Sequence, residues 1–329
     1  MLDFSEEKGA FVRWVFRSHL LESIYFYVKI ISKKIITSLH ISTTRKYPYT
    51  VKQYLHYNYQ LNNNKVFLKP FDFKKVNTLD VGSINLAGSE LEIHRNSIDW
   101  SKEWDDTEDE ESLHRWNWSI DKLSTIPSKE KSNLAAWVQG QQEDWVDKYQ
   151  VEIIKDKTDG KLRWESYTVG ERISNSSIFF HLTLGGWSSA KLSNAIQEQV
   201  VYLIHHLEYF GEDTGNHVVN NARAIYLAGV SFDCPEWKEL ALIIIENGVP
   251  IVVTEDGFLR EGSSHYQFLF TRWLLEIYYF ASIAEDEKMK EFLYPYLQLL
   301  LKQCHFFLVY NQSEEQWNMP LFGDISPDF

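Results

Sequence analysis

Asn216 and His217 follow Gly215, at the point where a helical period of apolar residues begins. The first N–H groups of a helix lack partners within the helix and the helix dipole is positive there, so this position favours an anion such as a carboxylate. Tyr266 stands at the start of the next-but-one long predicted helix, and its phenol can both donate and accept a hydrogen bond. Together, these residue types can neutralise an acid group and move a proton beside it.

Each of the three residues also has an ordinary structural interpretation. Asn216 is a typical N-cap, His217 could be a surface or packed histidine, and Tyr266 could be a buried aromatic residue of an amphipathic helix. A tyrosine that works as a base also needs its pKa lowered from about 10, which a cationic neighbour can do. Candidates close to Tyr266 in the sequence are Arg260, His265 and Arg272.

The elements that would position these residues are helical. From Leu113 onward, apolar residues recur at three- and four-residue spacing, and Gly, Pro and Asp residues separate the periodic segments. This pattern predicts an array of helical hairpins with short turns and no strict sequence repeat. The predicted long helices are 192–210, 218–230, 237–253, 266–283 and 289–310.

The first third of the chain has a different character. Residues 1–40 indicate one or two helices, which pack on their own domain or rest on a partner or membrane surface. Residues 41–99 contain Pro and Gly between short segments and predict an irregular leader with extended pieces at 65–71 and 91–94. The acidic stretch 105–111 is interpreted as a solvated loop.

The composition of the chain limits the kinds of molecule that it is expected to bind. The 329 residues carry a net charge of −13, which argues against nucleic acid because phosphate binding relies on basic patches. An acidic polysaccharide remains possible, since salt screens distant charge over roughly 8–10 Å. Aromatic residues reach 15% of the chain, and they suit stacking on sugars as well as core packing. No run of 18 apolar residues predicts a transmembrane helix.

The sequence offers no metal-binding motif. Cys234 and Cys304 do not have the spacing of metal ligands, and a single disulfide between them is possible but unsupported. His205 and His206 are adjacent, so they do not share a helix face, and no HExxH motif accompanies them. We therefore expect no metal and no cofactor in the helical part of the chain.

Four segments, in order, resemble the heparinase II/III-like polysaccharide lyases and their alginate-lyase relatives. The third is the most specific, and the second departs from the family where Ser174-Asn175-Ser176 replaces the usual Asn-Trp. The segments are Ile98-Asp-Trp100 with Leu113-His-Arg-Trp-Asn-Trp118; Trp164-Glu-Ser-Tyr167 through Glu171-Arg-Ile173; His206-Leu-Glu-Tyr209 through Gly215-Asn-His-Val-Val-Asn-Asn-Ala-Arg-Ala224 to Ala228-Gly229; and Asp256-Gly257 with Arg260-Glu-Gly-Ser-Ser-His-Tyr266.

The resemblance implies a mostly α fold, an incomplete (α/α) toroid. It implies a leader over residues 1–95 and a catalytic toroid over 96–329, which ends before the family's C-terminal β-sandwich domain. The family cleaves uronate-containing polysaccharides by β-elimination, and its members are commonly periplasmic or extracellular. The N-terminus of this chain does not read as a signal peptide, so a cytoplasmic protein is the alternative.

The resemblance also assigns roles to individual residues. Asn216 would neutralise the substrate carboxylate, His217 would act as base or carboxylate partner, and Tyr266 would act as acid and often as base. The residues expected to bind substrate are Arg172, Arg260, Glu261 and Trp187, although Arg172 could instead brace the toroid and Trp187 could pack in the core. Relatives often have Glu three residues after the motif His, where this chain has Asn220.

The sequence is also compatible with two other functions. A glycan-binding or polysaccharide-assembly protein could retain the toroid cleft without catalysis. An all-α glycoside hydrolase would need a pair of carboxylates across the cleft, and no spacing of the available acids singles out such a pair. The acids considered are Glu208, Glu255, Asp256 and Glu261.

Overall fold

The computed structural model describes residues 47–55, 68–72, 76–210, 214–313, 315–321 and 323. The chain divides into two compact units, Met1–Arg45 and Lys46–Phe329, and every described residue belongs to the second. The helices expected over residues 1–40 therefore lie outside the described residues. The boundary between residues 95 and 96 stays a prediction.

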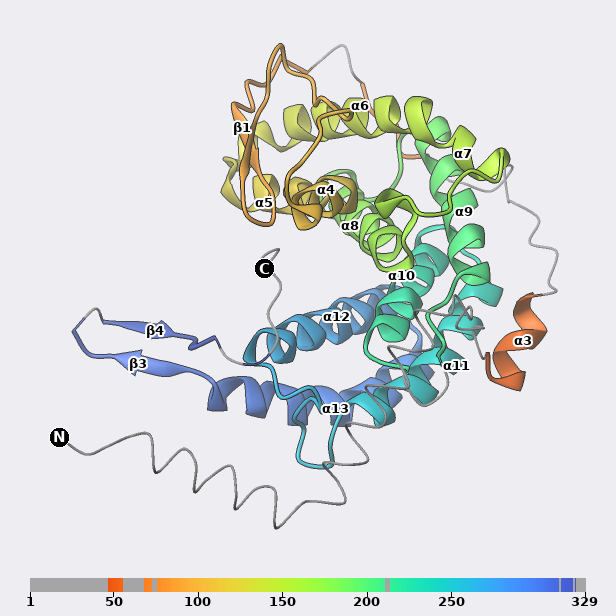
Figure 1. The fold of residues 1–329 in the computed structure, drawn as a ribbon, viewed down its shortest axis with the longest axis vertical. Helices are drawn as coiled ribbons and strands as arrows, with labels where there is room; N and C mark the ends of the chain where they lie inside the picture. The colour runs from red at the N-terminus through yellow and green to blue at the C-terminus, as the bar shows by residue number, and fades with distance from the viewer. Residues whose placement is uncertain are drawn as a thin grey trace. The chain divides into compact units, whose positions relative to one another are not determined.

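The second unit is mostly α-helical, as expected (Figure 1). Its longer helices are α4 (Thr107–Arg115), α5 (Asn117–Thr125), α6 (Lys131–Tyr149), α8 (Ser166–Leu184), α9 (Ala190–His205), α10 (His217–Ser231), α11 (Pro235–Val252), α12 (Ser264–Ile283) and α13 (Glu287–Phe306). Shorter ones are α3 (Tyr49–Leu55), α7 (Val151–Ile154), η2 (Ser128–Glu130) and η3 (Leu162–Trp164).

Strands form only small hairpins in the described residues. β1 (Ser83–Asn85) pairs with β2 (Glu90–Glu92), and β3 (Val309–Asn311) pairs with β4 (Gln316–Asn318), both antiparallel. The first hairpin contacts α5, so this part of the leader packs on the helices. It confirms an extended segment near 91–94, whereas residues 68–71 form no regular element and 65–67 lie outside the described residues.

The helices pack both against neighbours in sequence and against the helix after next. α10 contacts α8, α9, α11 and α12, and α12 packs along α13 (Figure 1). Short turns join α8 to α9, α10 to α11 and α12 to α13, whereas longer segments precede α10 and α12. This arrangement confirms the mostly α fold of the incomplete (α/α) toroid class. Among the described residues, no helix combines the length and the apolar character that crossing a membrane requires.

Side-chain caps explain why several helices begin where they do. Ser189 accepts a hydrogen bond from the N–H of Leu192 at the start of α9, and Ser263 accepts one from the N–H of Tyr266 at the start of α12. Each bond satisfies one of the N–H groups that a first helical turn leaves without partners. The cap at Ser263 therefore also fixes where Tyr266 enters its helix.

Two expectations about local structure were wrong. The acidic stretch 105–111 is not a loop, because Asp106 caps α4 and the acidic residues that follow occupy its first turn, where the helix dipole favours negative charge. The helix predicted over 289–310 ends at Phe306, and the apolar period continues into β3. Periodicity alone did not separate the end of this helix from a short strand.

Trp116 joins α4 to α5 in a left-handed conformation, with φ 62° and ψ 18°. This backbone conformation is rare for a bulky residue. The ring is fully buried, lies edge-on to Trp145 at 5.4 Å between ring centroids, and has the Arg172 guanidinium 5.7 Å from its centroid. Core packing therefore holds the joint in a conformation that the backbone alone disfavours.

Candidate active site

Asn216 precedes α10 in a helical conformation and makes no capping hydrogen bond with its side chain. Its Nδ2 instead donates to Oε2 of Glu261 at 3.0 Å, and the residue is only 3% exposed. One N–H of the amide is thus held by Glu261, while the second has no partner among the described residues. Asn216 lies at a helix start, as predicted, but its side chain does not cap the helix.

His217 is the first residue of α10, and its side chain is 47% exposed. Its Nδ1 lies 3.1 Å from Oε1 of Glu208. Burial opposes the charged imidazolium, but the hydrogen bond to Glu208 and the negative charges of Glu208, Glu165 and Glu261 together raise the pKa of His217. The ring therefore favours the protonated form, with Nε2 left as an available donor.

Glu165 and Glu208 complete a small charged cluster with His217. Burial, together with the neighbouring charge of Glu208, raises the pKa of Glu165, which also caps α8 by accepting from the N–H of Thr168 at 2.9 Å. One potential ligand atom from each of the three residues lies within 4.8 Å of the others, so this group could hold a divalent cation. The hydrogen bond between Glu208 and His217 gives two members of the cluster a direct interaction that needs no ion.

Tyr266 lies in the first turn of α12 and is partly buried. Its ring packs edge-on against His265 at 5.1 Å between centroids. Of the three cations proposed to lower its pKa, only His265 shows a ring contact, while Arg260 is exposed and Arg272 pairs with Glu276 at 3.6 Å. His265 is buried, so it is poorly suited to carry a charge.

A series of ring contacts connects the helix that carries Tyr266 to His217. Trp273 lies two turns further along α12 on the same face, and its ring centroid is 6.0 Å from that of Tyr167. The ring of Tyr167 in turn lies 4.8 Å from that of His217. From the other side, the bond between Asn216 and Glu261 ties the loop before α12 to the start of α10.

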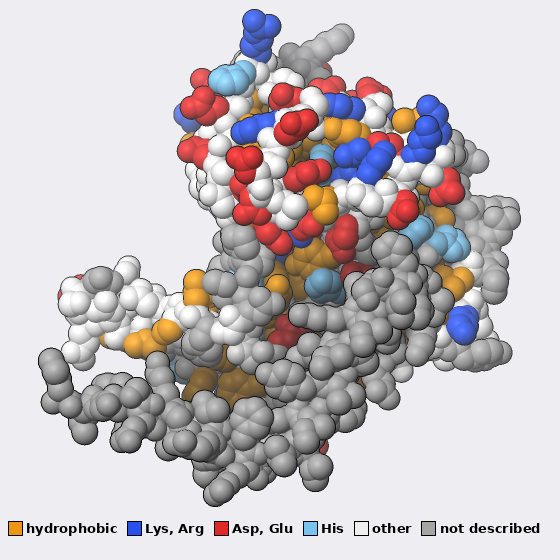
Figure 2. Space-filling model, in the orientation of Figure 1, with side chains coloured by type: hydrophobic (Ala, Val, Ile, Leu, Met, Phe, Trp, Pro, Cys, Tyr) orange, Lys and Arg blue, Asp and Glu red, His pale blue; other side chains and the backbone are white. Residues whose placement is uncertain are grey.

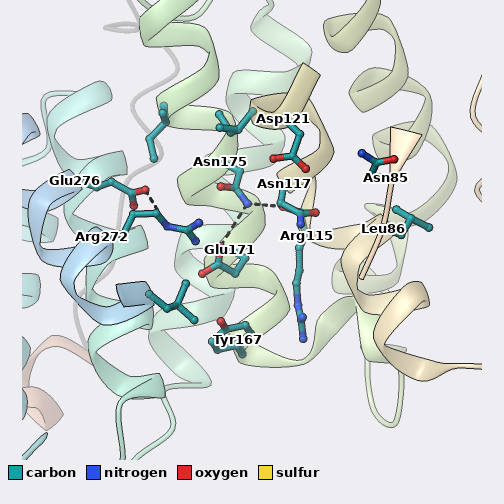
Figure 3. Close-up of a pocket in the computed structure, with 13 residues that line it drawn as sticks. Asn85, Leu86, Arg115, Asn117, Asp121, Tyr167, Glu171, Asn175, Arg272 and Glu276 are labelled. Atoms are coloured by element: carbon teal, nitrogen blue, oxygen red, sulfur yellow. Dashed lines mark hydrogen bonds and ion pairs between the residues drawn. The ribbon is translucent and has the colours of Figure 1, made fainter. Parts of the chain in front are cut away.

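A pocket of about 310 Å³ lies beyond Tyr167 (Figure 3). Asn85, Asn117 and Asp121 border it from β1 and α5, and Arg272 and Glu276 from α12, with residues of α8 between them. None of Asn216, His217 and Tyr266 lines this pocket. Tyr167 belongs both to the pocket and to the contact with His217, so it connects the two places.

Arg172 has no exposed surface. Its Nε donates to Oε1 of Gln199 at 2.8 Å, one terminal nitrogen donates to the backbone oxygen of His114 at 3.0 Å, and its guanidinium lies 4.3 Å from the centroid of the Trp145 ring. Burial lowers its pKa to about 9. Of the two roles suggested for Arg172, this geometry favours bracing the helices.

Trp187 also lies in the core, 3% exposed and stacked on Phe232 at 5.4 Å between centroids. Of its two suggested roles, packing is favoured. Glu261 is exposed, and its carboxylate accepts a hydrogen bond from Asn216, which suits a residue that orients the amide. Asn220 is fully buried and accepts a hydrogen bond from Arg223 at 2.8 Å, so it has no contact with His217 that would replace the Glu of relatives.

Sequence reasoning did not assign roles to several residues around the site. Glu208 appeared only as a possible hydrolase acid, and Tyr167 only as part of a motif. The sequence signal for both residues was their position. Glu208 belongs to the same family-like segment as Asn216 and His217, and Tyr167 belongs to the segment before it. Their contacts with His217 depend on how α8, α10 and the loop before α10 meet, which spacing alone does not determine.

Comparison with known proteins gives a family match over most of the chain. Residues 39–328 match the family model described as the heparinase II/III N-terminus. No match is found among curated proteins.

Several solved structures are similar at low identity. The heparan sulfate lyase HepC from Pedobacter heparinus is 20% identical with a TM-score of 0.46, covering 72% of this chain and 37% of that one. A heparinase III gene product with methylated lysines is 16% identical with a TM-score of 0.46, covering 83% and 46%. A further heparinase III is 20% identical with a TM-score of 0.46, covering 66% and 34%. This chain thus spans less than half the length of each.

Proposed function

Because this chain belongs to the heparinase II/III family, we propose that it supplies the helical part of a polysaccharide lyase that cleaves a uronate-containing polysaccharide by β-elimination. The observation that carries the proposal is the start of α10, where a free amide N–H of Asn216 lies beside His217, whose Nδ1 is hydrogen-bonded to Glu208 and whose pKa is raised. The solved structures named above are a heparan sulfate lyase and heparinases, and the substrate proposed for this chain is an acidic polysaccharide.

β-Elimination removes the proton at C5 of a uronic acid and expels the sugar linked at O4. A proton beside an ionised carboxylate is barely acidic, because the product of its removal carries a second negative charge. Donors aimed at that developing charge are usually the largest contribution to catalysis. Asn216, His217 and the free N–H groups of the α10 start would supply such donors.

Glu208 decides which role suits His217. By pairing with Nδ1 and raising the pKa of His217, it favours the form in which Nε2–H donates to the substrate carboxylate over the form in which Nε2 acts as a base. The proton at C5 would then be taken by Tyr266 in its phenolate form, and the phenol so formed would give that proton to O4 as the bond between C4 and O4 breaks. In this assignment His217 is the carboxylate partner, the second of the two roles that the family resemblance allows.

The test is cleavage of uronate polymers by the full chain, followed by ultraviolet absorbance of the new C4–C5 double bond conjugated to the carboxylate. Alginate, heparan-type polymers and bacterial exopolysaccharides are the panel. Tyr266→Phe should lower turnover by about 10²–10⁴-fold while substrate binding survives. The control is Tyr279→Phe, which removes an exposed phenol further along the same helix and should leave turnover unchanged.

A second function, glycan binding without cleavage, is favoured by one observation: the pocket is lined by none of the three proposed catalytic residues. Binding of a uronate polymer with no rise in absorbance on any member of the panel would support it and overturn the lyase proposal. A hydrolase would instead release reducing ends without the absorbance.

A further inference from the structure

Two separate segments of the chain flank His217 at the start of α10. One is the loop before α10, where Oε1 of Glu208 lies 3.1 Å from Nδ1 of His217. The other is the start of α8, where the ring of Tyr167 lies 4.8 Å from the imidazole between centroids and Glu165 adds a negative charge. Glu261, before α12, is a third carboxylate whose charge acts on His217. The setting of the imidazole therefore depends on how these segments are held in place.

Asn221 holds the first two segments with one amide. Its Oδ1 accepts a hydrogen bond from the backbone N–H of Glu208 at 3.2 Å, and its Nδ2 donates to the backbone oxygen of Ser166 at 3.3 Å. Ser166 is the residue between Glu165 and Tyr167. Asn221 has no exposed surface, so water does not compete for these two bonds. One buried side chain thus forms a bridge, the Asn221 bridge, between the backbones of the two segments.

The Asn221 bridge lies close to the residue whose surroundings it organises. Asn221 stands one turn after His217 on α10, so the two side chains project from the same face of the helix. α10 packs along α8, and the hydroxyl of Ser166 adds a second connection by donating to the backbone oxygen of His206 at 2.5 Å. The loop that carries Glu208 is therefore attached to both helices.

An amide is suited to this position because a single planar group supplies both an acceptor and donors. An ionised carboxylate only accepts. An apolar side chain would leave the N–H of Glu208 and the backbone oxygen of Ser166 without these partners, which is costly for buried groups. The adjacent Asn220 is equally buried but accepts from Arg223. Of the two neighbouring asparagines, Asn221 is the one that reaches the segments beside His217.

We propose that Asn221 is a positioning residue of the active site, which holds Glu208 and the start of α8 where they fix the imidazole of His217. It touches no substrate in this role and acts through Glu208. The inference rests on the proposed function for the catalytic role of His217, whereas the Asn221 bridge is a property of the fold. Without the amide, the loop with Glu208 loses its attachment to α10, and the direction of Nε2 is no longer fixed.

The experiment removes the amide by Asn221→Ala and measures two quantities. NMR titration of isotope-labelled histidine follows His217, whose signal is assigned by its absence in His217→Gln, and a pH profile of kcat/KM follows cleavage of a uronate polymer. We expect the pKa of His217 to fall, because the carboxylate that favours the imidazolium is no longer held beside it. We expect kcat to fall about tenfold and the loss of kcat/KM at high pH to begin at lower pH.

The matched control is Gln150→Ala, which removes another buried amide. Gln150 connects the end of α6 to α9 by accepting from Gln199 at 3.0 Å and donating to the backbone oxygen of Ala195 at 3.3 Å. This variant should also lower the free energy of unfolding, but it should leave the titration of His217 and the pH profile unchanged. An unchanged titration in Asn221→Ala, or equal shifts in the two variants, would rule out a positioning role.

A conservative variant, Asn221→Asp, keeps an acceptor for the N–H of Glu208 at nearly the same size. The pKa of His217 should stay at its parent value or rise, since Glu208 is still held and any added charge is negative. This variant decides the question where Asn221→Ala does not fold, and a fall in the pKa of His217 would then count against the proposal.

A double variant tests whether Asn221 acts through Glu208. In Glu208→Gln the carboxylate is already gone, so adding Asn221→Ala should leave the pKa of His217 where the first change puts it. Additive shifts would contradict the proposal. Because the titration needs no turnover, it tests the Asn221 bridge whether or not a polymer is cleaved. Absence of ultraviolet product from the parent protein, with the expected titrations observed, would overturn the lyase proposal alone.

Discussion

Two polar regions of the molecule each include a residue of α10, yet they use charge in opposite ways. Arg223, on α10, is fully buried and directs its guanidinium to Glu171 and Glu276. His217, at the start of the same helix, is 47% exposed and is paired on one ring nitrogen only. The charges of the first region hold helices together, whereas in the second region the Nε2 atom of His217 is available to a ligand.

The exposed charged residues differ from the buried ones in how much they contribute to folding. Figure 2 shows Asp and Glu side chains interspersed with Lys and Arg over the part of the surface where Figure 1 has α4, α5 and α6. Exposed pairs such as Lys191 with Asp147 contribute little to folding, because water and salt screen them. The polar groups that matter for stability are the buried ones, and those that matter for function are only partly paired.

The largest effect should come from breaking the buried region. Arg223→Leu leaves the Glu171 and Glu276 carboxylates without their buried partner, so the free energy of unfolding should fall by about 3–5 kcal/mol. Urea denaturation followed by circular dichroism measures it. The matched control, Arg272→Gln, removes an exposed partner of the same Glu276 and should cost at most about 1 kcal/mol. Equal losses in the two variants would contradict the distinction between the regions.

An intermediate effect should come from Glu208→Gln, which removes the acceptor that keeps His217 charged. A histidine with a raised pKa contributes while it is protonated, so activity in the parent protein should be lost as pH rises through the pKa of folded His217. In the variant this loss should begin at lower pH, with kcat/KM about tenfold lower in the interval between the two transitions.

Stability follows the same sign. The pair of Glu208 and His217 stabilises the fold fully below the unfolded pKa of histidine, about 6.5, and this contribution disappears as pH rises through the raised folded value. A pH–rate profile for kcat/KM, recorded with unfolding curves at each pH, checks both. A profile that does not move in Glu208→Gln would show that His217 does not act as a cation.

The smallest effect should come from the caps. Ser263→Ala removes the hydrogen bond to the N–H of Tyr266 and should cost about 1 kcal/mol of stability. Ser189→Ala removes the corresponding bond at α9, away from the proposed site, and should cost a similar amount. Thermal unfolding and turnover are measured together, and only Ser263→Ala should also change turnover, since its cap fixes the first turn that carries Tyr266. Identical turnover in both variants would separate the cap from catalysis.

Much of the helical order was predictable from the sequence, since α10, α11 and α12 match their predicted ranges closely, whereas α9 begins near its predicted start but ends at His205 instead of residue 210. The period of apolar residues determines which face of each helix is buried, and turn residues mark the ends. The predictions failed where two signals compete, as at the acidic start of α4, where solvated charge and a favourable helix start look alike in sequence.

The candidate site was less accessible to sequence reasoning. Asn216 and His217 were predicted at a helix start, and they are there. Their partners Glu261 and Glu208 could not be inferred from spacing, because these contacts form between loops that only the packed helices bring together. Arg172 and Trp187 show another limit of sequence reasoning. Their positions in the sequence suggested a functional role, but could not show whether the side chains face a ligand or the core.

The left-handed residue Trp116 restricts how mutation can change the pocket. Arg115 and Asn117, which flank this residue, both line the pocket, so their spacing depends on the left-handed turn between α4 and α5. Glycine at 116 would relieve the backbone but leave a void beside Trp145 and Arg172, whereas any residue large enough to fill that void retains the unfavourable φ. The route by which mutation could reshape this wall of the pocket is therefore narrow, and new specificities should arise first at exposed lining positions such as Asp121 and Asn85.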